Sequence, residues 1–194
     1  MKHATSRFMF SYWDAIRGER AAPERKHIEP SRLRQVIADT FILAAEPDGA
    51  ATFRLVGTRM AALFGRTLTG ADFGSLWPPE RRQDADRLLE IVTQDTSGVV
   101  AGLSGRSEHG AGIQLELLIL PLRHDGATRS RFLGTISPTA TPSWAGLVPI
   151  TELETRSVRV IRTEPERSGD ERPRELTPRE RRERFVVLPG GLNG

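Results

Sequence analysis

The sequence predicts an α+β domain in which a five-stranded antiparallel sheet carries helices on one face. Two strand-like runs, 41–44 and 53–56, are separated by Pro47-Asp48-Gly49, a combination typical of a hairpin turn. Three further strand-like runs, 99–107, 113–122 and 131–137, follow the longest helical stretch. Because the strands come in hairpins around a helical insertion, this order favours antiparallel pairing.

The clearest strand lies in 113–122, where apolar residues at odd positions alternate with Gln114 and Glu116. Two helices are expected between the hairpins. A short one follows Gly57 and ends at Gly65, since glycine is favoured just past a helix end. A longer one begins at Pro78-Pro79-Glu80, with Ala85, Leu88, Leu89 and Val92 on one face.

An N-terminal helical cap is predicted by Met9, Tyr12, Trp13 and Ile16, whose spacing lines one face of a helix. A helix of about a dozen residues is marginal alone, so this stripe must be buried against its own sheet or a second subunit. Tyr and Trp suit an interface because they combine an apolar body with a polar tip. We therefore expect a homodimer in which Trp13 is buried between subunits.

The 194 residues fit one domain with extensions. The expected divisions are a helical cap over 1–38, a core over 39–138, and a linker with a charged, partly disordered C-terminal tail over 139–194. The tail is rich in charge but balanced, with seven arginines and seven acidic residues in 163–184. Such a segment is typical of a solvated tail and not of a phosphate-binding arm. Before it, Val158-Arg159-Val160-Ile161 could form one more strand, added at an edge of the sheet.

Composition excludes several kinds of protein. Hydrophobic residues make up 38% and charged residues 27%, which is ordinary for a folded chain, and the net charge of +3 is small. No run approaches the roughly eighteen apolar residues of a membrane span, and the N-terminus lacks a secretory signal, so we expect a cytoplasmic protein that does not enter a membrane. No G-x-S-x-G, P-loop or H-E-x-x-H pattern occurs, so we expect no enzyme.

Several spaced motifs resemble one family. They are Tyr12-Trp13-Asp14, 28–30, 53–59, 63–66, 68–70, and Phe73 with Leu76-Trp77. In this order they resemble the PAS superfamily, and within it the short bacterial single-PAS proteins formerly catalogued as a domain of unknown function. The resemblance implies a five-stranded sheet in the order 2-1-5-4-3, helices closing a cavity on one face, and a sensory or regulatory role exerted on a protein partner.

Apolar residues of the predicted core are also the candidates for a ligand cavity. They either fill a solid core or wall a small-molecule site, since such sites are mainly apolar with a few polar groups. One of the arginines at 54, 59 and 66 could hold an anionic ligand at the cavity mouth. The cavity candidates are Phe53, Leu55, Arg59, Met60, Phe64, Phe73, Trp77, Leu89, Leu117 and Phe132.

Cofactors and metals are not expected. The chain has no cysteine for a flavin adduct, and 79–94 has no histidine to serve as a haem ligand. The four histidines, His3, His27, His109 and His124, fall in a terminus, a linker and turns, where solvated side chains are the rule. Two other functions remain open: a nucleic-acid-associated regulator, which the small net charge disfavours, and a structural interaction module without a ligand.

Overall fold

The computed structural model describes residues 1–46, 49–95, 97–124, 127–162 and 185–188. Its regular elements are α1 (Ala4–Arg17), β1 (Thr40–Ala45), β2 (Ala51–Val56), α2 (Thr58–Phe64), α3 (Arg82–Asp95), β3 (Gly98–Ser107), β4 (Gly112–His124), β5 (Ala127–Pro138), β6 (Ile150–Ile161) and β7 (Phe185–Leu188). Five short 3₁₀ helices connect them: η1 (Arg25–His27), η2 (Pro30–Leu33), η3 (Ile37–Asp39), η4 (Phe73–Leu76) and η5 (Pro79–Arg81).

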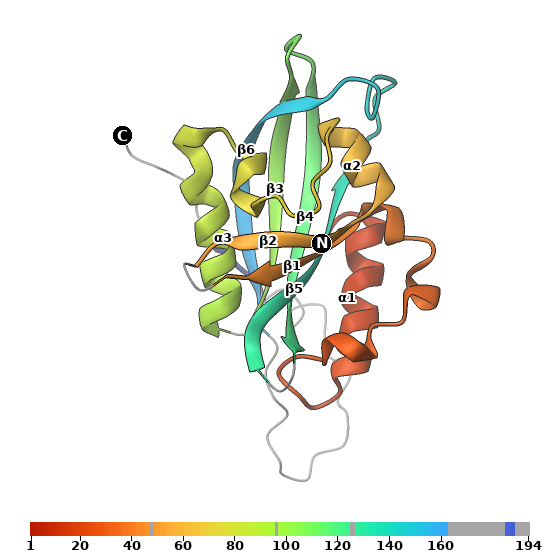
Figure 1. Ribbon diagram of the computed structural model, residues 1–194, viewed down its shortest axis with the longest axis vertical. Helices are drawn as coiled ribbons and strands as arrows, with labels where there is room; N and C mark the ends of the chain where they lie inside the picture. Colours follow the sequence, from red (N-terminus) through yellow and green to blue (C-terminus); the bar gives the residue numbers. More distant parts are fainter. Residues whose placement is uncertain (47–48, 96, 125–126, 163–184, 189–194) are drawn as a thin grey trace.

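The strands form one antiparallel sheet in the order β2-β1-β5-β4-β3-β6-β7 (Figure 1). The first five strands have the order expected from the sequence, so that prediction is confirmed. The sheet then continues beyond the predicted five strands, because β6 pairs with β3 from Ile161 opposite Gly98 to Ile150 opposite Ser107. Part of the segment predicted as linker and tail is therefore a full-length strand. The expected disorder of 163–184 lies outside the described residues.

Each face of the sheet carries its own hydrophobic layer, because successive side chains of a strand point to opposite faces. On β4, Leu115 and Leu117 face α2, η4 and α3, whereas Leu118 and Leu120 face α1. The prediction that α2 and α3, the two helices between the hairpins, lie on one face of the sheet is confirmed. The N-terminal cap covers the opposite face, so the sheet lies between two layers (Figure 1).

Helix α1 is bound to the sheet by Trp13 and to the loop before η2 by Tyr12. Trp13 is 0% exposed, and its Nε1 donates a hydrogen bond to the carbonyl oxygen of Pro121 at 2.8 Å. The Tyr12 hydroxyl accepts a hydrogen bond from the backbone N–H of Glu29 at 2.8 Å. The prediction of a helical stripe is confirmed, but Trp13 has no surface left for a second subunit. The prediction that Trp13 is buried between subunits was therefore wrong. The apolar face of β4 and β5 already covers the stripe on α1.

Helix α2 ends where the sequence indicated. Gly65 adopts a left-handed conformation, with φ of 59°, and its N–H donates to the carbonyl oxygen of Ala62. A Cβ at this position would lie 2.4 Å from Cγ of Pro149. Glycine is therefore required both by the backbone angle and by the close approach of the 139–149 segment.

None of the helices in the described part of the chain combines the length and the apolar run that a membrane crossing would need.

Candidate functional site

Most of the predicted cavity residues meet in a single packed layer beneath α2, η4 and α3. Aromatic rings form its centre: Phe53 lies 5.8 Å from Phe73 between ring centroids, and Phe73 lies 5.2 Å from Trp77. Edge-to-face pairs at such distances stabilise a core beyond the burial of their area. The layer contains eight of the ten candidates: Phe53, Met60, Phe64, Phe73, Trp77, Leu89, Leu117 and Phe132.

Leu55 does not belong to this layer. A bulge lies between Ile42 and Leu43 of β1, so that Leu55 pairs with Ile42 while Phe53 pairs with Leu43, and Arg54 is the extra residue. The bulge turns Leu55 to the α1 face, where its side chain is 36% exposed. Strict alternation of side chains along β2 would have placed Leu55 on the same face as Phe53, as expected for two cavity candidates. The extra residue, Arg54, interrupts this alternation.

Arg59 has a structural partner. Its guanidinium forms a hydrogen-bonded ion pair with the carboxylate of Asp39, which is only 1% exposed. Burial raises the pKa of the Asp39 carboxyl, and the positive charge of Arg59 opposes this effect. The pair joins the first turn of α2 to η3, so Arg59 holds two elements of the fold together at this position.

A groove opens at the edge of the packed layer, between α3 and the β1–β2 hairpin. It has a volume of about 750 Å³, and Leu89 and Phe132 form part of its apolar wall. Its polar wall is mostly acidic, because four carboxylates face a single arginine there: Glu46, Asp72, Asp86 and Glu90 against Arg82. This charge disfavours an anionic ligand and leaves room for a neutral or cationic one.

A second surface lies beside α2 and carries an exposed leucine. Leu147 is 82% exposed, although its neighbours Trp144 and Ala145 pack against the buried layer. Next to it, a shallow depression of about 490 Å³ is lined by Val56, Ala61, Ala62, Gly65, Arg66, Thr67, Leu68, Thr69 and Gly146. An apolar knob therefore stands beside a hollow of mixed character, in which Ala61, Ala62 and Leu68 lie next to polar side chains.

Glu116 is a buried carboxylate on the α1 face that the sequence did not single out. It is 5% exposed and accepts hydrogen bonds from the backbone N–H groups of Lys2, at 2.7 Å, and His3, at 3.0 Å. Burial tends to raise the pKa of its carboxyl, but these hydrogen bonds, the Ser6 hydroxyl and the N-terminal charge outweigh it and lower the pKa. The sequence held one signal for this buried carboxylate. Glu116 is a charged residue on a face of β4 that is otherwise apolar from Leu118 onward.

Groups that could hold a metal ion are absent among the described residues: no three His, Asp or Glu side chains come together there.

The indole of Trp77 in the aromatic layer has a hydrogen-bond partner, since its Nε1 donates to the Thr155 hydroxyl at 3.2 Å. This bond connects η4 to β6, the strand that the sequence left uncertain.

Comparison with solved structures finds similar folds at low identity. A light-oxygen-voltage protein of Rhodobacter sphaeroides is 12% identical with a TM-score of 0.45, over 56% of this chain and 63% of that one. A PAS domain from Colwellia psychrerythraea is 12% identical with a TM-score of 0.42, over 57% of this chain and 97% of that one. The light-state Aureochrome1 light-oxygen-voltage domain is 17% identical with a TM-score of 0.43, over 60% and 91%. At these values the likenesses carry no argument about function.

No curated protein matches the chain. A family model described as "PAS domain" matches residues 1–137, well over half of the chain. The match begins at residue 1 and so takes in α1, α2, α3 and the first five strands, whereas β6 and β7 lie beyond it. The chain therefore belongs to the PAS domain family, whose general role is sensory.

Proposed function

We propose that this protein is a cytoplasmic regulatory PAS module that acts by contact with a protein partner and catalyses no reaction. The observation that carries the proposal is the exposure of Leu147 on a segment that is otherwise fixed to the domain. The surface around Leu147 and α2 is the proposed contact surface, called the α2 surface below.

The segment that presents Leu147 is held in place by several contacts. Its backbone turns are closed by hydrogen bonds from Leu147 N–H and Val148 N–H to the carbonyl oxygen of Trp144, at 2.9 and 3.0 Å. Trp144 packs against the core, and Pro149 packs against Gly65. A side chain displayed by an ordered backbone loses little entropy on binding, which favours its use in an interface.

The hollow beside Leu147 supplies the second half of a contact. A partner side chain of aliphatic character fits between Ala61, Ala62 and Leu68, while Leu147 enters an apolar pocket of the partner. A knob and a hollow side by side are also what a two-fold symmetric pair of identical surfaces uses. A homodimer through the α2 surface therefore replaces the one predicted through Trp13.

A small ligand at the groove beside α3 is a second candidate function. The groove gives access to Leu89 and Phe132, and its volume is in the range of small-molecule sites. Its occupant would be neutral or cationic. We propose neither haem nor a cysteine-linked flavin, because the chain has no cysteine and the sequence of α3 has no histidine.

The contact proposal is tested by site-specific photo-crosslinking. A photoreactive phenylalanine analogue at position 147 is expected to capture one defined protein in cells, identified by mass spectrometry. Leu147→Asp should then abolish co-purification of that protein, whereas Arg87→Ala on the outside of α3 should leave it intact. If the captured protein is a second copy of this chain, sedimentation should show a dimer that Leu147→Asp converts to a monomer. Equal capture from positions 147 and 87 would overturn the proposal.

A further inference from the structure

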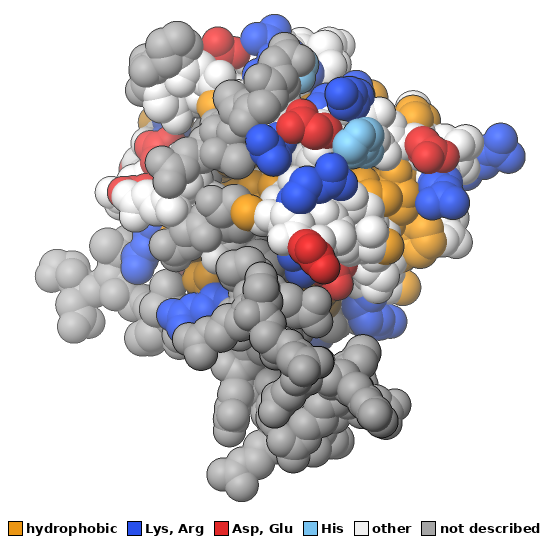
Figure 2. Space-filling view, turned by 90° about the horizontal axis from the view of Figure 1, so that it is seen from below, with side chains coloured by type: hydrophobic (Ala, Val, Ile, Leu, Met, Phe, Trp, Pro, Cys, Tyr) orange, Lys and Arg blue, Asp and Glu red, His pale blue; other side chains and the backbone are white. Residues whose placement is uncertain are grey.

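A basic pocket lies on the α1 face, on the other side of the sheet from the aromatic layer. It has a volume of about 770 Å³ and is formed where η1 crosses the ends of β4 and β5. Basic side chains gather beside a histidine and an apolar patch at this end of the molecule (Figure 2). Its lining residues are Arg20, Glu24, Arg25, Lys26, His27, Ile42, Arg54, Leu55, His124 and Arg131.

The path of the chain explains how these residues meet. The ladder between β3 and β4 begins at Val99 and Ile119, so the last residues of β4 have no β3 neighbour. The segment before η1 takes that place, because Arg123 N–H donates to the carbonyl oxygen of Pro23 at 2.9 Å and Glu24 forms a bridge with Arg123. Ile28, buried just after η1, anchors the other end of the turn.

The charge of the pocket is strongly positive. Five cationic side chains and two histidines face one carboxylate, that of Glu24, which lies 3.4 Å from Nε of Arg123. Arg54 is paired with Glu46 at 2.9 Å. Among the described residues, by contrast, no carboxylate is paired with Lys26, Arg25 or Arg131. Arg20 also forms no ion pair with a described carboxylate, because its guanidinium donates to the carbonyl oxygens of Ile16, at 2.9 Å, and Arg17, at 3.0 Å. The described carboxylates therefore leave most of the positive charge of the pocket unbalanced.

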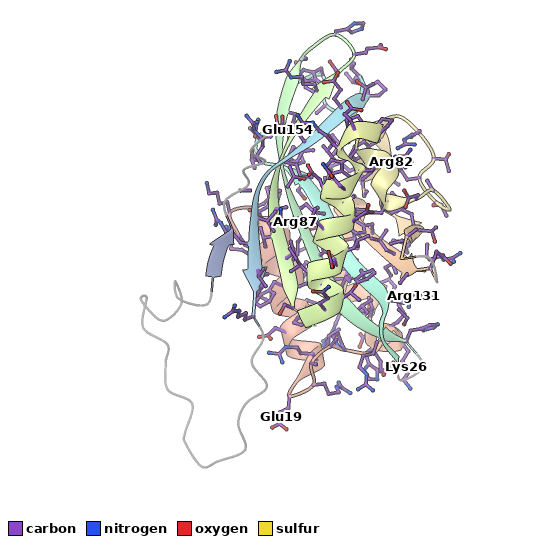
Figure 3. The ribbon with its side chains drawn as sticks, turned by 90° about the vertical axis from the view of Figure 1, so that its left-hand side faces the viewer. Glu19, Lys26, Arg82, Arg87, Arg131 and Glu154 are labelled. Atoms are coloured by element: carbon purple, nitrogen blue, oxygen red, sulfur yellow. The ribbon has the colours of Figure 1, made fainter. Side chains whose placement is uncertain are left out.

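The cations of Lys26 and Arg131 come from two elements that are far apart in the sequence. Lys26 is carried by η1 and Arg131 by β5, and both lie toward the same end of the molecule (Figure 3). The Arg131 Nη1 donates to the carbonyl oxygen of Ser130 at 2.7 Å, which fixes the guanidinium close to the sheet. A guanidinium held in this way, together with a lysine ammonium lining the same pocket, is suited to the several oxygens of a phosphate.

The floor of the pocket is apolar. It contains Ile42 and Leu55, the pair that the β2 bulge places opposite one another on this face. The same bulge puts Arg54 at the rim. An apolar floor with a cationic rim matches an organic anion that has both a nonpolar body and a charged group, because the body is desolvated while the charge is paired.

We propose that this pocket binds a small organic phosphate, such as a nucleotide, as a signal input to the domain. The pocket is concave and belongs to one chain, which favours a small molecule over an extended polyanion such as DNA. The proposal is independent of the contact proposed at the α2 surface, because the two sites have no lining residue in common, although both reach β2.

Titration calorimetry of the full chain tests the proposal, with AMP, inorganic pyrophosphate and adenosine as probes. AMP is expected to bind at least tenfold more tightly than adenosine, and its affinity should fall as salt is raised. The double variant Lys26→Ala/Arg131→Ala should weaken AMP binding at least tenfold. Arg87→Ala is the matched control, an exposed arginine on α3, and should bind as the wild type does (Figure 3). Thermal unfolding of each variant verifies that it is folded.

Three results would overturn the proposal. The first is that neither AMP nor pyrophosphate binds at millimolar concentration, and the second is that Arg87→Ala weakens binding as much as the double variant does. The third is that a DNA duplex of twenty base pairs binds in low salt when AMP does not, which would indicate a nucleic-acid surface. In each case the crosslinking from position 147 is unaffected, so failure of this site and failure of the contact proposal are distinguishable.

Discussion

The indole nitrogen of Trp13 and the carbonyl oxygen of Pro121 form a buried hydrogen bond that joins α1 to the centre of the sheet. Ile119 is the last residue of β4 that pairs with β3, and Pro121 lies two residues beyond it. No β3 residue there needs a hydrogen bond from position 121, so a proline, which has no N–H, is tolerated. The bond satisfies an acceptor that the α1 layer shields from water. Helix α1 is therefore a structural part of the domain.

Removing this hydrogen bond should destabilise the protein. Trp13→Phe keeps most of the apolar contact but leaves the Pro121 carbonyl unpaired, which costs about 1–3 kcal/mol of the free energy of unfolding. Urea denaturation followed by circular dichroism measures the loss. Trp144→Phe, at a partly buried position, is the control and should cost less. A loss below about 0.5 kcal/mol for Trp13→Phe, the range of surface substitutions, would show that the bond contributes nothing.

Glu116 should make stability depend on pH. Its pKa is lowered in the folded protein, so its contribution is fully present above the ordinary value of 4.5 and is lost as the pH falls through the lower folded value. Glu116→Gln should be less stable than the wild type at pH 7, and the difference should shrink below pH 4.5. The pKa of Asp39 is raised, so Asp39 changes stability with pH in the opposite direction. Because Asp39 is present in both the wild type and Glu116→Gln, its contribution cancels in the difference between their free energies of unfolding.

The exposed Glu152→Gln on β6 is the control for this experiment. It should show no pH-dependent difference from the wild type. A Glu116→Gln variant whose deficit stays constant from pH 7 to pH 3 would contradict the account of the buried carboxylate.

The two faces of the sheet should respond differently to truncation. Leu117→Ala removes a side chain that is fully buried in the aromatic layer and should cost about 2–5 kcal/mol. Leu55→Ala should cost far less, because the bulge leaves Leu55 partly exposed at the floor of the basic pocket. Chemical denaturation gives both values. Equal costs would mean that Leu55 packs beside Phe53, as strict alternation predicted.

Much of the fold could be predicted from the sequence because it depends on local signals. The Pro47-Asp48-Gly49 turn and the alternation in β4 determine hairpins, and the hairpins with the family resemblance indicate the order of the first five strands. The β2 bulge could not be predicted, since one extra residue at Arg54 leaves no mark on composition or period.

The candidate sites were harder to predict, because each is assembled from segments far apart in the chain. The helical period of 9–16 indicates a buried stripe but does not say whether the sheet or a second subunit covers it. Lys26 and Arg131 meet only because the segment before η1 runs beside the end of β4. The partner of β3 was likewise uncertain, since only 158–161 of β6 had a recognisable strand pattern.

Hydrogen–deuterium exchange of the complex with the crosslinked partner tests the central claim, regulation by contact at the α2 surface, most directly. Amide exchange should slow in Thr58–Phe64 and in 142–148 when the partner binds, and should be unchanged in Arg82–Asp95. Protection confined to α3, or no protection near Leu147, would contradict the account.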